Sequence, residues 1–124
     1  MNARITYVNV YVSDLSRAVD FYHDALGLPV LFRDDRFGYA RLDAGPIYLG
    51  LAVVGRDQEN FSQLVGVHTK IGFAAPDIDA AYRELSAKGV KFPMVPTDQP
   101  WGGRLALFAD PDGNVLYLDR LAEA

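Results

Sequence analysis

The segment that decides the fold lies near the start of the chain and reads Ile5-Thr6-Tyr7-Val8-Asn9-Val10-Tyr11-Val12. Its later residues alternate strictly, with valine on one side and tyrosine or asparagine on the other. A strand that is buried on one face only has this period of two. The segment therefore predicts a half-buried strand whose polar face carries hydrogen-bonding groups rather than charges.

A helix is predicted directly after this strand. Ser13 and Asp14 offer side-chain oxygens that cap the first turn of a helix. Apolar residues then recur three and four positions apart, at Ala18, Phe21, Tyr22, Ala25 and Leu26. Gly27 is the expected C-cap, because glycine accepts the left-handed backbone that ends many helices. Further strands are predicted over residues 29–32, 37–43 and 47–53.

The same order of elements recurs after a polar linker over residues 54–66. Pro76 and Asp77 open a second helix, and Gly89 closes it. Pro96 is expected to end the strand that follows this helix. Asp110–Asn114 has the composition of a tight turn, which we interpret as structural rather than as a calcium loop. The strands of this second half are predicted over residues 69–74, 90–95, 104–109 and 115–118.

Together these patterns predict an α+β protein built from two tandem βαβββ modules, over residues 4–53 and 67–121. Each module supplies a four-stranded sheet with one apolar face, which is half of a core. Pairing the two sheets would form an incomplete barrel around a cavity, with the helices outside. We therefore expect one domain over residues 1–124.

Composition restricts the function further. The chain has 124 residues, no cysteine and a net charge of −4, and its basic residues form no run. Disulfides, thiolate metal sites and cysteine nucleophiles are excluded, and nucleic acid is not an expected partner. No apolar stretch approaches the roughly 18 residues that a membrane helix needs, and the first residues lack the apolar region of a signal peptide, so we expect none. A cytoplasmic protein without a membrane partner is expected.

The ordered motifs resemble those of the vicinal oxygen chelate superfamily, which includes glyoxalase I, bleomycin-resistance proteins and extradiol dioxygenases. In the first module they are Tyr11-Val12-Ser13-Asp14-Leu15, Phe21-Tyr22 and Leu26-Gly27-Leu28. In the second module they are Ala80-Ala81-Tyr82 with Leu85 and Gly89, Trp101-Gly102, and Asp110-Pro111-Asp112-Gly113-Asn114. The resemblance covers nearly the whole chain and implies the fold, but this fold hosts many reactions.

The resemblance also implies four metal-ligand positions, which fall in this sequence on Tyr7, Gly50, Lys70 and Tyr117. Glycine offers no ligand, and a protonated lysine brings a positive charge to the place of the metal. We therefore expect no metal and no other cofactor, as in the branch that resembles bleomycin-resistance proteins. A displaced site that uses His68 and Asp119 stays an open alternative.

Strand alternation predicts which side chains would line the cavity and bind a ligand. They are Tyr7, Asn9, Tyr48, His68, Lys70, Trp101 and Tyr117. Such a site suits an aromatic or amphipathic molecule with an acceptor or anionic group near Lys70. The alternative is that the tyrosines only fill the interior and that Lys70 pairs with Asp119. Arg41 and Arg104 have no predicted face, because their strands lack clean alternation.

A small-molecule binding protein that needs no metal is the function that these observations favour. One alternative is a metal-dependent lyase, isomerase or dioxygenase, as the resemblance implies. Another is a metal-free enzyme in which Lys70 is the candidate catalytic residue, acting as a base or a Schiff-base amine. A scaffold with a filled core is the fourth. The resemblance further implies a homodimer.

Overall fold

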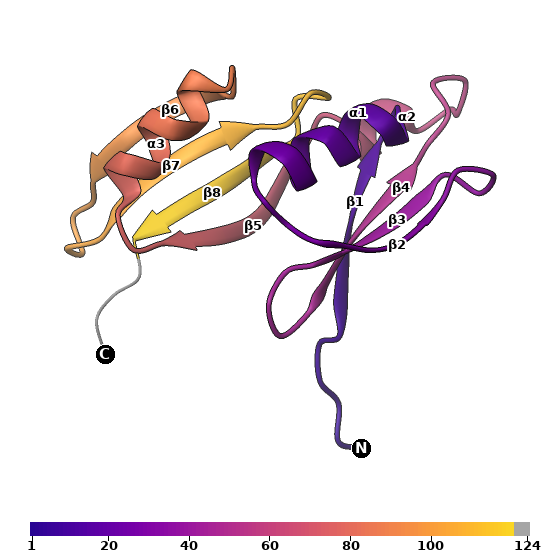
Figure 1. The fold of residues 1–124 in the computed structure, drawn as a ribbon, viewed down its shortest axis with the longest axis horizontal. Coiled ribbons are helices and arrows are strands. Elements are labelled where there is room, and N and C mark those ends of the chain that lie inside the picture. Colours follow the sequence, from indigo (N-terminus) through magenta and orange to yellow (C-terminus); the bar gives the residue numbers. More distant parts are fainter. Residues whose placement is uncertain (121–124) are drawn as a thin grey trace. The chain divides into compact units, whose positions relative to one another are not determined.

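The computed structural model describes residues 1–120, and its contacts divide the chain into two compact units. The first unit ends at Gly66 and the second begins at Val67. Each unit holds a four-stranded sheet and a covering helix (Figure 1). The predicted pair of βαβββ modules is confirmed. The single domain, the incomplete barrel and its cavity remain predictions.

Unit 1 begins with the strand that the alternating segment predicted. Its elements are β1 (Tyr7–Val12), α1 (Leu15–Val19), η1 (Asp20–Ala25), β2 (Val30–Asp34), β3 (Tyr39–Asp43), β4 (Tyr48–Val53) and α2 (Phe61–Leu64). The strands lie in the order β1-β4-β3-β2. β1 runs parallel to β4, and the other neighbours are antiparallel. The short helix α2 lies in the predicted linker.

Alternation places the core of unit 1 on one face of this sheet. Val10 and Val12 of β1 are buried, as are Leu49 and Leu51 of β4. Tyr22 reaches the same core from η1 and is fully buried. Burying side chains of this size stabilises the fold by roughly 1.5–3 kcal/mol each. The opposite face of the sheet carries the polar and aromatic residues of the same strands.

The first helix starts where the capping residues predicted it. Asp14 Oδ1 accepts a hydrogen bond from the backbone N–H of Arg17 at 3.0 Å. After Val19 the helix widens into the π-helical turn η1, which the apolar spacing did not predict. Gly27 follows with φ of +80°, so the expected left-handed C-cap is confirmed.

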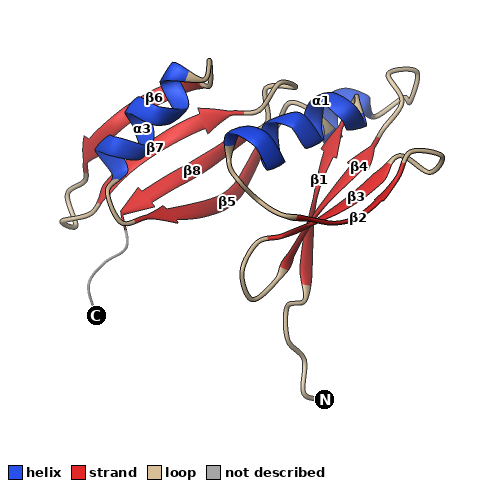
Figure 2. Cartoon of the chain, viewed as in Figure 1, coloured by secondary structure: helices blue, strands red, loops and turns tan. Residues whose placement is uncertain are grey.

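Unit 2 repeats the pattern with a longer helix. Its elements are β5 (His68–Ala75), α3 (Ile78–Ala87), β6 (Lys91–Asp98), β7 (Arg104–Ala109) and β8 (Val115–Arg120), in the sheet order β5-β8-β7-β6. Asp77 Oδ1 caps α3 by accepting from Ala80 N at 3.0 Å. Figure 2 shows α3 over the strands of this unit. The buried residues Ile78, Leu85 and Phe108 form part of its core.

The expectation that Pro96 ends a strand is wrong. β6 continues through Pro96 to Asp98 and also contains Pro93. Proline has no N–H to donate, so it is tolerated at the edge of a sheet, and β6 is an edge strand. The pairing of β6 with β7 is irregular on both sides of Met94. No helix within residues 1–120 has the length and apolarity to cross a bilayer.

Candidate aromatic binding face

The sheet of unit 1 presents a second face, opposite its core, that is rich in aromatic rings. Register defines it, because residues directly opposite in neighbouring strands point to the same side. Tyr7 lies beside Tyr48, and the next row aligns Asn9 with Gly50, Arg41 and Phe32. We call this surface the open face, and it comprises Tyr7, Asn9, Tyr11, Phe32, Tyr39, Arg41, Asp43, Tyr48 and Gly50.

The three residues of unit 1 that the sequence placed at a ligand site all lie on the open face. Tyr7 is 58% exposed and Tyr48 is 44% exposed, and the two are direct neighbours in β1 and β4. Asn9 occupies the next position on the same side of β1. The structure therefore brings Tyr7, Asn9 and Tyr48 together.

Gly50 forms the floor of this surface. A Cβ atom there would overlap Asn9 Oδ1 and would lie 2.8 Å from the Tyr39 hydroxyl. Both polar groups therefore lie over the glycine, which is buried beneath them. Glycine at this position lets an amide and a phenol come close to the backbone of β4. The open face thus combines aromatic rings with hydrogen-bonding groups at its centre.

Arg41 is the residue of this face that strand alternation did not assign. The register with Gly50 and Phe32 places it among the aromatic rings. Its guanidinium carbon lies 5.4 Å from the centroid of Tyr48 and 5.9 Å from that of Phe32. Both contacts are within cation–π range. Phe32 and Tyr39, which sequence reasoning also missed, have ring centroids 6.4 Å apart.

Two of the ligand-site residues that were predicted in unit 2 also lie close together. The rings of His68 and Tyr117 have centroids 4.8 Å apart. His68 pairs with Val115 of β8, so its ring leans along the strand toward the next residue on that side. His68 Nδ1 accepts a hydrogen bond from the backbone N–H of Lys70 at 3.0 Å. These contacts form a small polar and aromatic cluster within unit 2.

Lys70 lies in a β-bulge. The regular alternation from which its face was predicted therefore does not hold at this position. His68 pairs with Val115 and Gly72 pairs with Tyr117, so four steps along β5 match two steps along β8. Lys70 has φ of +62°, in the left-handed region that side chains rarely adopt. The period of two is therefore interrupted between His68 and Gly72. Lys70 itself is exposed.

Trp101 lies away from the His68–Tyr117 cluster. Arg120, at the end of β8, donates a hydrogen bond to the carbonyl of Gly102 at 3.1 Å. His68 pairs with Val115, at the other end of the same strand. The indole is 74% exposed and folds back over Gly103, where a Cβ would lie 2.7 Å from Nε1. The structure thus separates Trp101 from His68 by the length of β8.

The residues at the positions implied for a metal do not fit a divalent ion. Tyr7, Gly50, Lys70 and Tyr117 supply no carboxylate or imidazole. The displaced pair does not fit either, because Asp119 lies four residues beyond the neighbour of His68, which is about 13 Å of strand. Among residues 1–120, no three histidine, aspartate or glutamate side chains form a metal-binding group.

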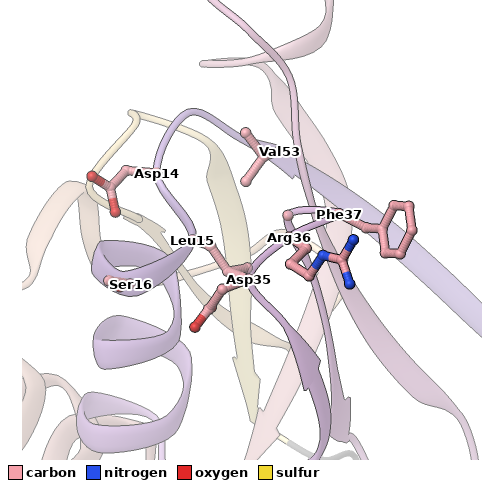
Figure 3. A pocket seen from close by; sticks show the side chains of 8 residues that line it. Asp14, Leu15, Ser16, Asp35, Arg36, Phe37 and Val53 are labelled. Carbon is pink, nitrogen blue, oxygen red and sulfur yellow. The ribbon is translucent and has the colours of Figure 1, made fainter.

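A surface pocket of about 630 Å³ lies at another place in unit 1, and the sequence did not predict it. Figure 3 shows Asp14 and Ser16 at the start of α1 opposite the β2–β3 turn, from which Asp35 and Arg36 project. The Asp14 carboxylate caps α1, and the Asp35 carboxylate accepts from Arg33 Nε at 2.8 Å. Because both acids already hold structural hydrogen bonds, we interpret this pocket as part of the scaffold.

The electrostatics of unit 2 centre on Arg104, whose face the sequence left open. Its guanidinium donates two hydrogen bonds to Asp79, at 2.9 and 3.2 Å, and one to Asp98 at 3.0 Å. The hydrogen bond from Arg104 lowers the pKa of Asp79 below its ordinary value, and burial opposes this only in part. The same partners raise the pKa of Arg104. This network links α3 to the β6–β7 hairpin.

Comparison with protein families agrees with this fold. The family model described as "Glyoxalase/Bleomycin resistance protein/Dioxygenase superfamily" matches residues 4–118. The chain is similar to the protein YraH of Bacillus subtilis (strain 168), with 29% identity over 130 residues, which cover 95% of this chain and 98% of YraH.

Solved structures give the same result. One is a member of that superfamily from Sphaerobacter thermophilus DSM 20745, with 30% identity and a TM-score of 0.82, over 96% of this chain and 98% of the other. Another is TnmS3, an antibiotic binding protein from Streptomyces sp. CB03234, with 27% identity and a TM-score of 0.76, over 97% of both chains.

Proposed function

The chain belongs to the Glyoxalase/Bleomycin resistance protein/Dioxygenase superfamily, and from this premise we propose that it is a protein that binds a small aromatic or amphipathic molecule without a metal ion. The observation that carries this proposal is the open face of unit 1. Tyr7, Phe32 and Tyr48 expose large parts of their rings there, beside the amide of Asn9. Aromatic rings offer a large contact area at low entropy cost, and nearby polar groups orient a ligand.

Two further points support the proposal. The implied metal positions hold residues that do not fit a divalent ion, and no group of three metal-binding side chains occurs within residues 1–120. TnmS3, to which the chain is similar, is described as an antibiotic binding protein. We therefore favour ligand binding over metal-dependent catalysis.

We propose ligand-contacting residues for each unit separately. In unit 1 they are Tyr7, Asn9 and Tyr48. In unit 2 they are His68, Lys70 and Tyr117, whereas Trp101 lies at the other end of β8 and is left out of this set. We also propose that the protein acts in the cytoplasm as a homodimer. Light scattering on the eluate of a sizing column tests the dimer, and the mass of a single chain, 13.7 kDa, would contradict it.

A direct test titrates the protein with 2-naphthamide, an uncharged planar aromatic molecule, and follows the heat of binding. We expect saturable binding that weakens by about tenfold in Tyr48→Ala, because the ring supplies contact area worth roughly 1–2 kcal/mol. Phe37→Ala is the matched control, since Phe37 is 81% exposed but lies in the β2–β3 turn outside the open face.

The control variant should bind 2-naphthamide as the unchanged protein does. Equal loss in both variants would show that binding is a general effect of exposed rings and would contradict a site on the open face. Absence of any binding to the unchanged protein would contradict the proposed function for this class of ligand.

A further inference from the structure

We propose that the ligand is a planar aromatic molecule that carries a carboxylate or another anionic oxygen group, and that Arg41 recognises this group. The inference rests on the proposed function, because it concerns the ligand that the open face would bind. It assigns the recognition of the anion to Arg41. Strand alternation does not predict on which face of the sheet this residue lies.

The position of the Arg41 guanidinium is the first argument. Phe32 and Tyr48 flank it at 5.9 and 5.4 Å, so the cation is held among rings of the open face. A cation–π contact uses no N–H donor in a hydrogen bond to an oxygen, so the donors of the guanidinium stay available to a ligand. The arrangement resembles a clamp in which rings contact the body of a ligand and the N–H edge contacts its acceptor.

The hydrogen-bonding state of Arg41 is the second argument. No atom of residues 1–120 accepts a hydrogen bond from its side chain, and no carboxylate there lies within salt-bridge distance. Arg104 shows the contrast, since Asp79 and Asp98 occupy its donors. A guanidinium has five N–H donors in a planar fork that matches a carboxylate. Arg41 therefore brings to the open face a set of donors without a protein acceptor.

The acids at the ends of β2 and β3, Asp34 and Asp43, hold the turns that follow these strands. Asp43 Oδ1 accepts a hydrogen bond from Gly45 N at 2.9 Å and so holds the β3–β4 turn. Asp34 Oδ1 accepts from Arg36 N at 2.9 Å and from Phe37 N at 3.2 Å in the β2–β3 turn. Both carboxylates hold turns and neither pairs with Arg41, so the guanidinium at the centre of the open face stays available to an anionic group of a ligand. A cationic ligand would compete with Arg41 for the same rings.

A pair of probes that share the naphthalene ring, one anionic and one neutral, tests this inference. The unchanged protein is titrated with 2-naphthoate and, separately, with 2-naphthamide. We expect 2-naphthoate to bind at least about tenfold more tightly, because a charge-assisted hydrogen bond is about twice as strong as a neutral one. Equal affinities would overturn the inference and leave the proposed function intact. Failure of both probes would contradict the proposed function itself.

Variants then test whether Arg41 is responsible. Arg41→Gln should bring the ratio of the 2-naphthoate affinity to the 2-naphthamide affinity close to one, which is the quantity measured. Arg36→Gln is the matched control, because it removes the same charge from an exposed turn of the same unit and should keep the preference. Loss of the preference in both variants would show that net charge alone is responsible, and retention in Arg41→Gln would place the anion site elsewhere.

Discussion

Asn114 is the buried polar residue on which the β7–β8 turn depends. Its Nδ2 donates to Asp110 Oδ2 at 2.9 Å, and its Oδ1 accepts from Val67 N at 3.1 Å. Asp110 Oδ1 in turn accepts from the backbone N–H groups of Asp112 and Asn114. The carboxylate of Asp110 is thus fully used inside the turn. This agrees with the structural interpretation of the segment and not with a calcium loop.

Replacing Asn114 should destabilise the protein. Asn114→Ala leaves Val67 N and Asp110 Oδ2 without these partners in a buried place, and we expect a loss of about 2 kcal/mol in the free energy of unfolding. Urea unfolding followed by circular dichroism measures it. Asn60→Ala is the control, because Asn60 is exposed and its side chain caps nothing, and it should change stability by less than about 0.5 kcal/mol. Equal effects would contradict the role of the turn.

Single residues differ in how far the sequence alone predicts their structural roles. The capping role of Asp14 and Asp77 and the left-handed Gly27 depend on local chemistry, so the sequence alone predicts them. The place of Arg41 depends on the register of β3 with β4 and β2, which is a tertiary property. Local patterns carry no information on register, so they do not predict the face on which Arg41 lies.

Among the elements, α3 and the β6–β7 hairpin are joined by one arginine. Arg104 at the start of β7 contacts Asp79 in the first turn of α3 and Asp98 at the end of β6. The hydrogen bond from Arg104 lowers the pKa of Asp79. A carboxylate whose pKa is lower in the folded than in the unfolded chain stabilises the fold above its unfolded pKa, and this contribution is lost as the pH falls.

Asp79→Asn should therefore lower the melting temperature near neutral pH, and its difference from the unchanged protein should shrink as the pH falls through the ordinary aspartate value of 3.8 toward the lower folded pKa. Thermal unfolding at several pH values between about 6 and 3 measures this difference. Glu84→Gln removes an equal charge from the same helix, where Glu84 contacts Lys88 at 3.6 Å on an exposed surface. A difference that stays constant with pH for Asp79→Asn would contradict the role of this ion pair.

The elements themselves were predictable where one local signal decides them. β1 and both helix starts follow from alternation and caps. The continuation of β6 through Pro96 follows from its edge position, which depends on the order of the strands. The bulge at Lys70 likewise depends on how β5 pairs with β8. Both features depend on how the strands pair in the sheet, and the sequence pattern of a single strand does not show this pairing.

On the scale of the whole molecule, the repeated βαβββ order and the family follow from ordered motifs along the chain. Membership is supported over residues 4–118. Strand alternation also predicts three ligand-site residues that lie on the open face, Tyr7, Asn9 and Tyr48. It missed Phe32, Tyr39 and Arg41, whose strands show no clean alternation and which pairing alone brings to this face. Local sequence patterns therefore predict the fold, whereas the set of residues on the open face depends on how the strands pair.

The central claim is that this chain binds an aromatic ligand without a metal ion. The measurement that tests it most directly is a calorimetric titration of 2-naphthoate before and after treatment of the same purified protein with a chelator. We predict saturable binding with the same affinity in both titrations, since Tyr48 and Arg41 would hold the ligand without help from a metal. Binding that disappears on chelation and returns with a divalent ion would contradict the claim and indicate a metal site.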